Sequence, residues 1–463
     1  MPRDLSSAAS HRRLHPAPPA APTYRFVTLG CKLNQADSAG IESRLRALGM
    51  TRAGEDAAAD LVVLNTCTVT HLADREARQI ARRLRRANPG ATLVATGCYV
   101  TRDPEALRAV PGLDHFVPLS EQADRIPAIA AVLLGLPSDT GARDLGDLGA
   151  TAVCDTGGEI TDRTRAFLKI QDGCDLRCSY CIIPQVRGPS RSVPPDTVFD
   201  RLGRLADAGF LEVVLTGVNT GDYGLDLDPP VPLLDLLRRA VAGPGPARIR
   251  LNSLEPRTVT PGLVAFLAAC GDAVAPHLQV PLQSGCDAVL SRMRRNYRTA
   301  DYRRVVESLR LALPDIGLGA DVIVGFPGET DAEFETTCRF IEAAGLNYLH
   351  VFSWSPRPGT PAASFPGAAP PGVVRERSAR LRVLGRELSL RFRRSFVGRE
   401  RTVLTLRETR GDGAVRALTD NFIDLTLELD GRDPGPILNR MLRARIVEAT
   451  ESGTRAVLAD LPA

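Results

Sequence analysis

The sequence predicts a three-part α/β protein: an N-terminal open parallel α/β sheet, a central partial (β/α)6 barrel and a small C-terminal all-β barrel. Two series of short β-rich runs alternate with helical periods, which is typical of parallel sheets covered by helices. A third series near the C-terminus has no helices between its runs, which indicates a small antiparallel barrel. The 463 residues suffice for two or three separate cores.

The composition is that of a globular protein of enzyme size. Apolar residues make up 44% of the chain and charged residues 24%, which argues against wholesale disorder. No apolar run approaches the roughly 20 residues that span a bilayer, so we expect a cytoplasmic protein with no membrane partner. Because the net charge is only +4, any affinity for nucleic acid has to come from local basic patches.

Residues 1–22 are rich in Ala, Pro, Arg and Ser. We expect a disordered leader there, with an organellar transit peptide as the alternative. The N-terminal domain is expected over residues 23–137. Its predicted strands are Tyr24–Leu29, Leu61–Asn65 and Thr92–Thr96, and its predicted helices are Asp37–Leu48 and Ala73–Ala87.

A Gly- and Asp-rich linker is expected over residues 138–160, and the barrel domain over residues 161–394. The six predicted barrel strands are Ala166–Ile170, Glu212–Thr216, Arg248–Asn252, Pro276–Val280, Gly319–Val324 and Asn347–Phe352. In such barrels the active site lies at the carboxyl ends of the strands. The last domain is expected over residues 395–463, with β-rich runs at Thr402–Leu406, Ala414–Leu418, Phe422–Leu429, Met441–Val447 and Arg455–Ala459.

Three cysteines, Cys174, Cys178 and Cys181, form a C-x3-C-x2-C motif directly after the first predicted barrel strand. Three thiolates in a short loop can hold three irons of a cubane cluster and leave the fourth iron open for an exogenous ligand. A zinc knuckle or a ferredoxin-like electron carrier is the alternative. Both ordinarily need a fourth ligand nearby, and the next cysteine is the distant Cys270.

Three further cysteines, Cys31, Cys67 and Cys98, each follow one of the three N-terminal strands. If those strands are parallel neighbours, the thiols converge at one edge of the sheet and can share a cluster. Gly30 and Gly97 would let backbone approach that cluster closely. The alternative is three unrelated buried cysteines.

The C-x3-C-x2-C loop, with the aromatic Tyr180 before its last cysteine, resembles the radical S-adenosylmethionine superfamily. The resemblance implies that the open iron binds the amino and carboxylate groups of S-adenosylmethionine. One-electron reduction then cleaves the sulfonium and gives a 5′-deoxyadenosyl radical, while the protein supplies orientation.

The six cysteines together resemble the methylthiotransferase family of these radical enzymes, over nearly the whole chain from Tyr24 onward. The motifs Thr28–Gln35, Asn65–Thr70 and Thr96–Tyr99 are most similar to the branch that acts on N6-threonylcarbamoyladenosine beside the transfer RNA anticodon. The resemblance implies two [4Fe-4S] clusters, each held by one cysteine triad, and S-adenosylmethionine. It also implies replacement of the C2 hydrogen of the adenine by a methylthio group.

Three other functions stay open at this point. Two are methylthiolation of isopentenyladenosine in transfer RNA and methylthiolation of a ribosomal-protein aspartate. The third, from a different class, is a non-catalytic iron–sulfur RNA-binding protein.

Several loops at strand ends are candidate contacts for S-adenosylmethionine. Gly217 and Asn219 stand where the family has a Gly-rich motif, although its usual Gly-Gly-Glu is absent. Ser253 and Glu255 offer a hydroxyl and a carboxylate for ribose or ammonium groups, or could cap the helix that follows. The remaining candidates, on the same resemblance, are Tyr180, Gln283 and Val324.

The implied partners are transfer RNA, an electron donor such as flavodoxin or ferredoxin, and a sulfur source. The stretch Arg375–Arg401 holds ten arginines against three glutamates, which suits phosphate binding, although a solvated amphipathic helix explains it equally well. The β-rich tail resembles the TRAM barrel of transfer RNA modifying enzymes.

Cys154, Cys270, Cys286 and Cys338 match no ligand position of the family, and His277 is expected to be a core histidine.

Overall fold

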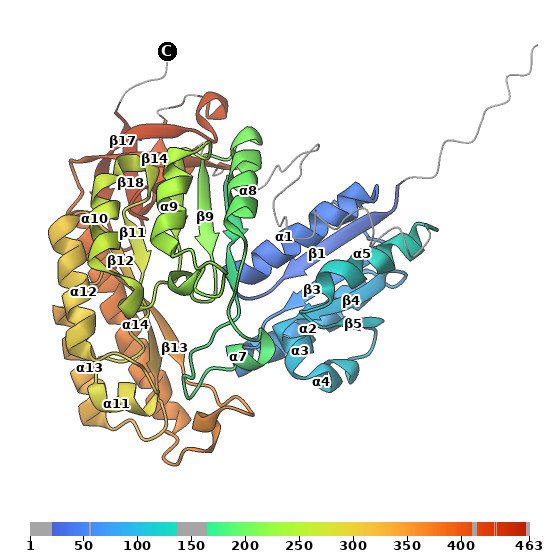
Figure 1. The fold of residues 1–463 in the computed structure, drawn as a ribbon, viewed down its shortest axis with the longest axis horizontal. Helices are drawn as coiled ribbons and strands as arrows, with labels where there is room; N and C mark the ends of the chain where they lie inside the picture. The colour runs from blue at the N-terminus through green and yellow to red at the C-terminus, as the bar shows by residue number, and fades with distance from the viewer. Residues whose placement is uncertain are drawn as a thin grey trace, which may run out of the picture.

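The computed structural model describes residues 21–54, 57–136, 164–409, 414–429, 431 and 433–459. Almost all of the expected leader, and the whole of the expected linker, therefore lie outside the described residues. Figure 1 shows the N-terminal sheet, in blue, beside the central barrel, with the C-terminal barrel, in red, at one end of the latter. The three-part α/β prediction is confirmed. No helix among the described residues is long and apolar enough to span a membrane.

The N-terminal sheet is parallel throughout, with strand order β2-β1-β3-β4-β5. Apolar residues of α1 and α5 are buried on one face, and those of α2, α3 and α4 on the other. The strands are β1 (Thr23–Thr28), β2 (Thr51–Arg52), β3 (Leu61–Thr66), β4 (Thr92–Gly97) and β5 (His115–Val117). The helices are α1 (Lys32–Ala47), α2 (His71–Ala87), α3 (Cys98–Arg102), α4 (Pro104–Arg108) and α5 (Gln122–Leu133).

The first helix differs from its prediction. It begins at Lys32, directly after Cys31, and not at Asp37. The early turn is helical because Leu33 and Ala36 are buried beneath it. Cys31 is consequently the residue that precedes the helix, on extended backbone.

The six predicted barrel strands are present, arranged as two three-stranded parallel sheets, β6-β9-β10 and β11-β12-β13. An isolated parallel bridge between Ile249 and Val274 lies close to the junction of the two sheets. β11 is shorter than predicted, because prolines at 276 and 281 flank it and cannot donate to a ladder. The strands are β6 (Arg165–Lys169), β9 (Glu212–Thr216), β10 (Arg248–Leu251), β11 (His277–Gln279), β12 (Gly317–Val324) and β13 (Tyr348–Ser353).

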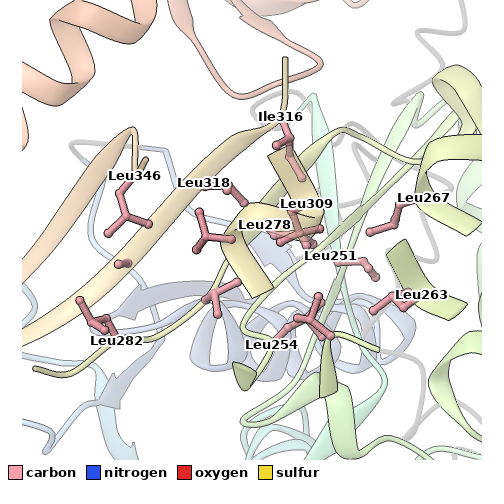
Figure 2. Close-up of a cluster of buried hydrophobic side chains, with 14 of the residues drawn as sticks. Leu251, Leu254, Leu263, Leu267, Leu278, Leu282, Leu309, Ile316, Leu318 and Leu346 are labelled. Carbon is pink, nitrogen blue, oxygen red and sulfur yellow. The ribbon is translucent and has the colours of Figure 1, made fainter. Parts of the chain in front are cut away.

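Leucines from strands, loops and covering helices fill the core of this domain (Figure 2), among them Leu251, Leu278 and Leu318. The helices are α7 (Ile183–Val186), α8 (Pro195–Asp207), α9 (Leu233–Ala242), α10 (Pro261–Ala269), α11 (Asp287–Arg292), α12 (Thr299–Ala312), α13 (Asp331–Ala343) and α14 (Pro371–Arg394). A short antiparallel pair, β7 (Gln171–Asp172) and β8 (Arg191–Ser192), frames the loop that holds the barrel cysteines.

The C-terminal barrel is closed in the order β14-β15-β16-β18-β17. One pairing, β16 with β18, is parallel, which corrects the expectation of a wholly antiparallel barrel. It docks on the central barrel through Phe422, which stacks on His277 at 4.2 Å, and through carbonyls that accept hydrogen bonds from Arg250. The strands are β14 (Glu400–Thr409), β15 (Val415–Thr419), β16 (Asp424–Glu428), β17 (Met441–Ala449) and β18 (Thr454–Leu458).

Candidate active site between two cysteine triads

The N-terminal fold brings the first cysteine triad together. Cys31, Cys67 and Cys98 follow β1, β3 and β4, which are adjacent strands with the same direction. Each of the three thiols interacts electrostatically with the other two. Cys67 and Cys98 are buried, whereas Cys31 is exposed. The triad therefore lies at the carboxyl edge of the sheet, where open α/β sheets bind ligands.

Two glycines give this edge its shape. Gly30 has φ +94°, and a Cβ there would lie 2.8 Å from the Cys67 Sγ. Gly97 has φ +95°, and a Cβ there would lie 2.4 Å from the carbonyl oxygen of Thr66. A side chain at Gly30 would therefore crowd the Cys67 thiol, and one at Gly97 would clash with the backbone between β3 and Cys67. The backbone thus leaves room for a bulky group against the sulfurs.

Burial disfavours the ionised form of two of these thiols. Burial raises the pKa of Cys98 to about 12 and also raises the pKa of Cys67. Iron binding would displace those protons, since the thiolate is the ligand. No three His, Cys, Asp or Glu side chains among the described residues are placed to hold one metal ion. A cubane needs wider spacing, because each thiolate binds a different iron. The donor set fits such a cluster.

The second triad lies in the loop after β6 and β7, at the carboxyl end of the first barrel strand. Gly173, with φ +73°, turns the chain into this loop, and a Cβ there would lie 1.8 Å from the carbonyl oxygen of Pro189. The backbone of Ser179 is held from both sides, by the carbonyl of Met293 and the N–H of Ala362. The loop is therefore fixed by the barrel before any cluster binds.

The three thiols of this loop also lie together. Burial, together with the nearby Cys178, raises the pKa of Cys174 to about 11 and that of Cys181 to about 12. Arg295 donates to the Cys178 Sγ at 3.1 Å and pairs with Glu255. A guanidinium so placed would stabilise negative charge on a bound thiolate. This donor set also fits a cubane cluster with one open iron.

An ion-pair network joins the two triads. Arg187, which is buried, donates to both oxygens of Asp172 at 2.9 and 3.0 Å, to Asp37 at 3.1 Å and to the Asn34 Oδ1 at 2.7 Å. Lys169 pairs with the same two aspartates. Since Asn34 and Asp37 belong to α1 and the other residues to the barrel, the network fixes one domain on the other.

A second contact between the domains lies on the other side of the site. Arg357, from the loop after β13, pairs with Asp74 of α2 at 2.7 Å and donates to the carbonyl of Thr68 at 3.1 Å. Asp74 also pairs with Arg102 at 3.1 Å. Both cysteine loops are therefore tied across the domain boundary.

A cavity of about 220 Å³ lies between these two contacts. Its wall includes Val69 and Thr70, just after Cys67, and Tyr180 and Cys181 from the barrel loop. The other lining residues are half apolar or aromatic and half polar: Ile182, Ile183, Ile323, Phe352 and Trp354, and Gln283, Asp321, Ser353, Ser355 and Arg357. A cavity with both apolar and polar groups suits a planar organic substrate. The cavity is thus lined by one thiol of the barrel triad and by the segment that follows Cys67 of the N-terminal triad.

Some of the expected cofactor contacts line the cavity, and others do not. Tyr180 and Gln283 line the cavity, and Gln283 has φ +64°. Glu255 is buried on Arg295, and the helix α10 is capped by Thr260, so neither Glu255 nor Ser253 caps it. The Val324 side chain is buried in the barrel core, away from the cavity.

Gly217 and Asn219 lie over the side chain of Gln171. A Cβ at Gly217 would lie 2.7 Å from the Gln171 Oε1, and the Asn219 N–H donates to the same oxygen at 3.0 Å. The Gln171 Nε2 donates in turn to the carbonyl of Gly173, directly before the first barrel cysteine. Both residues therefore lie beside the cluster loop.

Sequence analysis missed Arg187, Lys169, Asp172 and Arg295. Their partners are distant in the chain: Arg187 and Asn34 are 153 positions apart. No local motif marks them.

Of the other cysteines, Cys338 is buried in the core and Cys270 bonds the carbonyl of Phe266, while Cys154 lies outside the described residues. His277 is a buried core histidine, as expected.

Comparisons with known proteins identify the family. Residues 168–341 match the radical SAM superfamily, and residues 23–118 match a family described as uncharacterized protein family UPF0004. The chain is 34% identical to the threonylcarbamoyladenosine tRNA methylthiotransferase MtaB of Bacillus subtilis, over 92% of this chain and 94% of that protein. This chain belongs to the methylthiotransferase family of radical S-adenosylmethionine enzymes. Its cofactors are S-adenosylmethionine and [4Fe-4S] clusters, two in a methylthiotransferase, as the sequence led us to expect.

Two further comparisons define the breadth of the similarity. The methylthiotransferase is 33% identical to the tRNA-2-methylthio-N(6)-dimethylallyladenosine synthase of Acidothermus cellulolyticus, over 94% of this chain and 85% of that one. The solved structure of the radical S-adenosylmethionine methyltransferase TsrM from Kitasatospora setae superposes with a TM-score of 0.54 and 16% identity. It covers 74% of this chain and 75% of TsrM, which shows a shared fold.

Proposed function

We propose that this methylthiotransferase acts on transfer RNA and replaces the C2 hydrogen of N6-threonylcarbamoyladenosine, beside the anticodon, by a methylthio group. One observation carries the proposal: a single cavity is lined by Cys181 of the barrel triad and by Val69 and Thr70, which follow Cys67 of the N-terminal triad in the chain. A reaction that needs both a radical and a sulfur at one carbon requires such an arrangement. The relatives named for the threonylcarbamoyl substrate support the branch.

The two triads have different roles in this proposal. Cys174, Cys178 and Cys181 hold the cluster that binds S-adenosylmethionine. Cys31, Cys67 and Cys98 hold the cluster that carries sulfur to the substrate. When bound, these groups supply a radical to remove the C2 hydrogen, the sulfur for the new C–S bond and, from a second S-adenosylmethionine, the methyl group.

The chain's own residues orient the reactants and exclude water. Tyr180 and Trp354 form aromatic walls of the cavity and pack edge-on against Phe326, at 6.4 and 6.5 Å. These rings offer stacking surface for the adenine. Among the expected contacts, Gly217, Asn219, Ser253, Glu255 and Gln283 are proposed to hold S-adenosylmethionine. Val324 is proposed only to shape the wall behind it, because its side chain is buried.

The arginine-rich helix and the C-terminal barrel are proposed to bind the RNA backbone. Part of the arginine set serves the fold: Arg377 pairs with Glu329 and Asp331, and Arg380 pairs with Glu335. Other arginines of α14 are exposed and suit phosphate contacts: Arg375, Arg382, Arg386, Arg391 and Arg394. Some arginines of α14 therefore stabilise the fold, and the exposed ones are proposed to bind RNA.

The remaining features complete the proposal. The domains extend over residues 23–137, 161–394 and 395–463. The reaction takes place in the cytoplasm, where an electron donor such as flavodoxin or ferredoxin reduces the clusters and a separate sulfur source resupplies the N-terminal site.

Analysis of modified nucleosides tests the proposal. The full chain, reconstituted with iron and sulfide without oxygen, is incubated with reductant, S-adenosylmethionine and RNA carrying either threonylcarbamoyladenosine or isopentenyladenosine. We expect the methylthio derivative of threonylcarbamoyladenosine by mass spectrometry and little or none of the other product. Product from isopentenyladenosine alone would assign the chain to the other branch, and cleavage of the cofactor without either product would contradict a transfer RNA substrate.

A further inference from the structure

The chain contains only two lysines, Lys32 and Lys169, among its 58 lysine and arginine residues. All of the other residues in this set are arginines, which occur both on exposed helices and in buried ion pairs. An arginine is a planar fork that binds bidentately, whereas a lysine is a compact point charge. Both lysines lie at the junction of the N-terminal sheet and the barrel, close to the candidate active site. These two positions therefore take an ammonium where the rest of the chain takes a guanidinium.

The fold explains one of the two lysines. Lys169 pairs with Asp37 and Asp172 in the network that joins the domains. Lys32 has no such partner: within the described ranges, no carboxylate lies within 4.0 Å of its Nζ. Its Nζ instead donates a hydrogen bond, at 3.1 Å, to the neutral amide oxygen of Asn252.

Helix stability does not explain Lys32 either. It is the first residue of α1, where the positive end of the helix dipole disfavours a cation. No acidic side chain lies in that first turn to offset the charge. A partly exposed cation in such a place is positioned for a ligand that the protein alone does not supply.

The surroundings of Lys32 form the mouth of the barrel. Asn252, its partner, comes directly after β10 and donates to the hydroxyl of Thr216 at the end of β9, at 3.2 Å. The ammonium therefore lies over the carboxyl ends of two barrel strands, next to Cys31 in the chain. Beneath it, three arginines share the single carboxylate of Glu212: Arg165, Arg248 and Arg250. The carboxylate of Asp321 also acts on the Lys32 ammonium, but Lys32 and the three arginines together outnumber these two carboxylates, and the remaining positive charge favours an anionic ligand.

We propose that the Lys32 ammonium binds the carboxylate of the threonylcarbamoyl group and so selects this nucleoside over one with an uncharged alkyl substituent. The inference rests on the proposed function and names the residue that gives it specificity. The substituent on N6 of threonylcarbamoyladenosine ends in a carboxylate, whereas the isopentenyl group has no charge to bind. A carboxylate held by Lys32 would place the adenine beside the sulfur-carrying triad. A nucleoside without this carboxylate would place a neutral group against the Lys32 ammonium, and the protein would gain no affinity from the charge.

The test compares two anticodon stem-loop RNAs that differ at one functional group. One carries threonylcarbamoyladenosine, and the other carries the same nucleoside with its carboxylate converted to a neutral primary amide. For the reconstituted full chain we expect a higher kcat/KM with the acid. For Lys32→Gln we expect kcat/KM to fall roughly 10- to 100-fold with the acid and little with the amide, as for loss of one charge-assisted hydrogen bond.

A second variant keeps Lys32 in place. Asn252→Asp puts a carboxylate of nearly the same shape against the ammonium, and we expect it to lower the preference for the acid in the same way. Arg238→Gln, which removes one exposed positive charge from the outer helix α9, is the matched control and should leave the preference unchanged.

The outcomes separate the two claims. If the wild-type protein modifies the acid but both variants keep its preference over the amide, the role of Lys32 is overturned and the proposed function stands. If Lys32→Gln cleaves S-adenosylmethionine more slowly when no RNA is present, Lys32 serves the cofactor, and the inference is likewise overturned. If the wild-type protein modifies neither RNA, the proposed function fails and the inference fails with it.

Discussion

Replacing Cys67 with alanine is expected to abolish methylthiolated nucleoside while 5′-deoxyadenosine is still produced. Cys67 belongs to the N-terminal triad, and the backbone of Ser179, in the loop that carries Cys174, Cys178 and Cys181, is held by barrel residues. Removing one ligand of a three-cysteine site should lower the methylthio product by about 100-fold or more. Cys178→Ala should abolish both products, since the cofactor can then no longer be cleaved.

The comparison needs folded protein. Cys67 is buried in the N-terminal sheet, so its replacement could also destabilise that domain. Circular dichroism and the iron bound by the barrel site provide the check, and Cys338→Ala, a buried cysteine outside both triads, is the matched control. Wild-type rates of methylthiolation by folded Cys67→Ala would show that the N-terminal triad has been misassigned.

Gly30→Ala is expected to impair the same half of the reaction by a steric route. A Cβ at this position would lie 2.8 Å from the Cys67 Sγ, and the backbone has φ +94°. The new methyl group would therefore occupy the space in which a cluster meets that sulfur. We expect at least about 10-fold less methylthiolated product and little change in 5′-deoxyadenosine, measured in the same assay.

Gly49→Ala separates the steric effect from the backbone strain. Gly49 has φ +91°, but no atom lies within 4 Å of a Cβ built there. Both substitutions thus cost about 1–2 kcal/mol of left-handed strain, and only one intrudes on the triad. Equal losses of methylthiolation in the two variants would refute a cluster at the N-terminal site.

The cysteine triads could be predicted because their signal is local. The spacing of the barrel cysteines is a motif within eight residues, and each N-terminal cysteine follows a recognisable strand. Parallel pairing of β1, β3 and β4 then suffices to bring distant thiols together. The strands themselves were predictable because their apolar runs are short and bounded by turn residues.

The contacts that join the domains could not be predicted in this way. Arg187 bonds Asn34, Asp37 and Asp172, which come from three separate segments and from two domains. Nothing near Arg187 in the sequence marks it as different from other arginines. The same holds for the arginine-rich helix, in which Arg377 and Arg380 form structural ion pairs that resemble exposed cations in the sequence.

Helix α1 shows a third reason for error. Its predicted start is Asp37, after the recognisable motif Thr28–Gln35. The structure shows a helix from Lys32 onward, with Leu33 packed beneath it. Motif and helix overlap there, so Cys31 and Lys32 are set at a helix end that points toward the barrel.

Iron and sulfide analysis of reconstituted protein tests most directly the central claim, that the two cysteine triads hold two independent clusters. The wild-type chain should bind about eight iron and eight sulfide, because each three-cysteine site holds one cubane. Replacing Cys174, Cys178 and Cys181 together with alanine should leave about half of both, and replacing Cys31, Cys67 and Cys98 should leave the other half. A triple variant that loses all of the iron, or none of it, would contradict two separate sites.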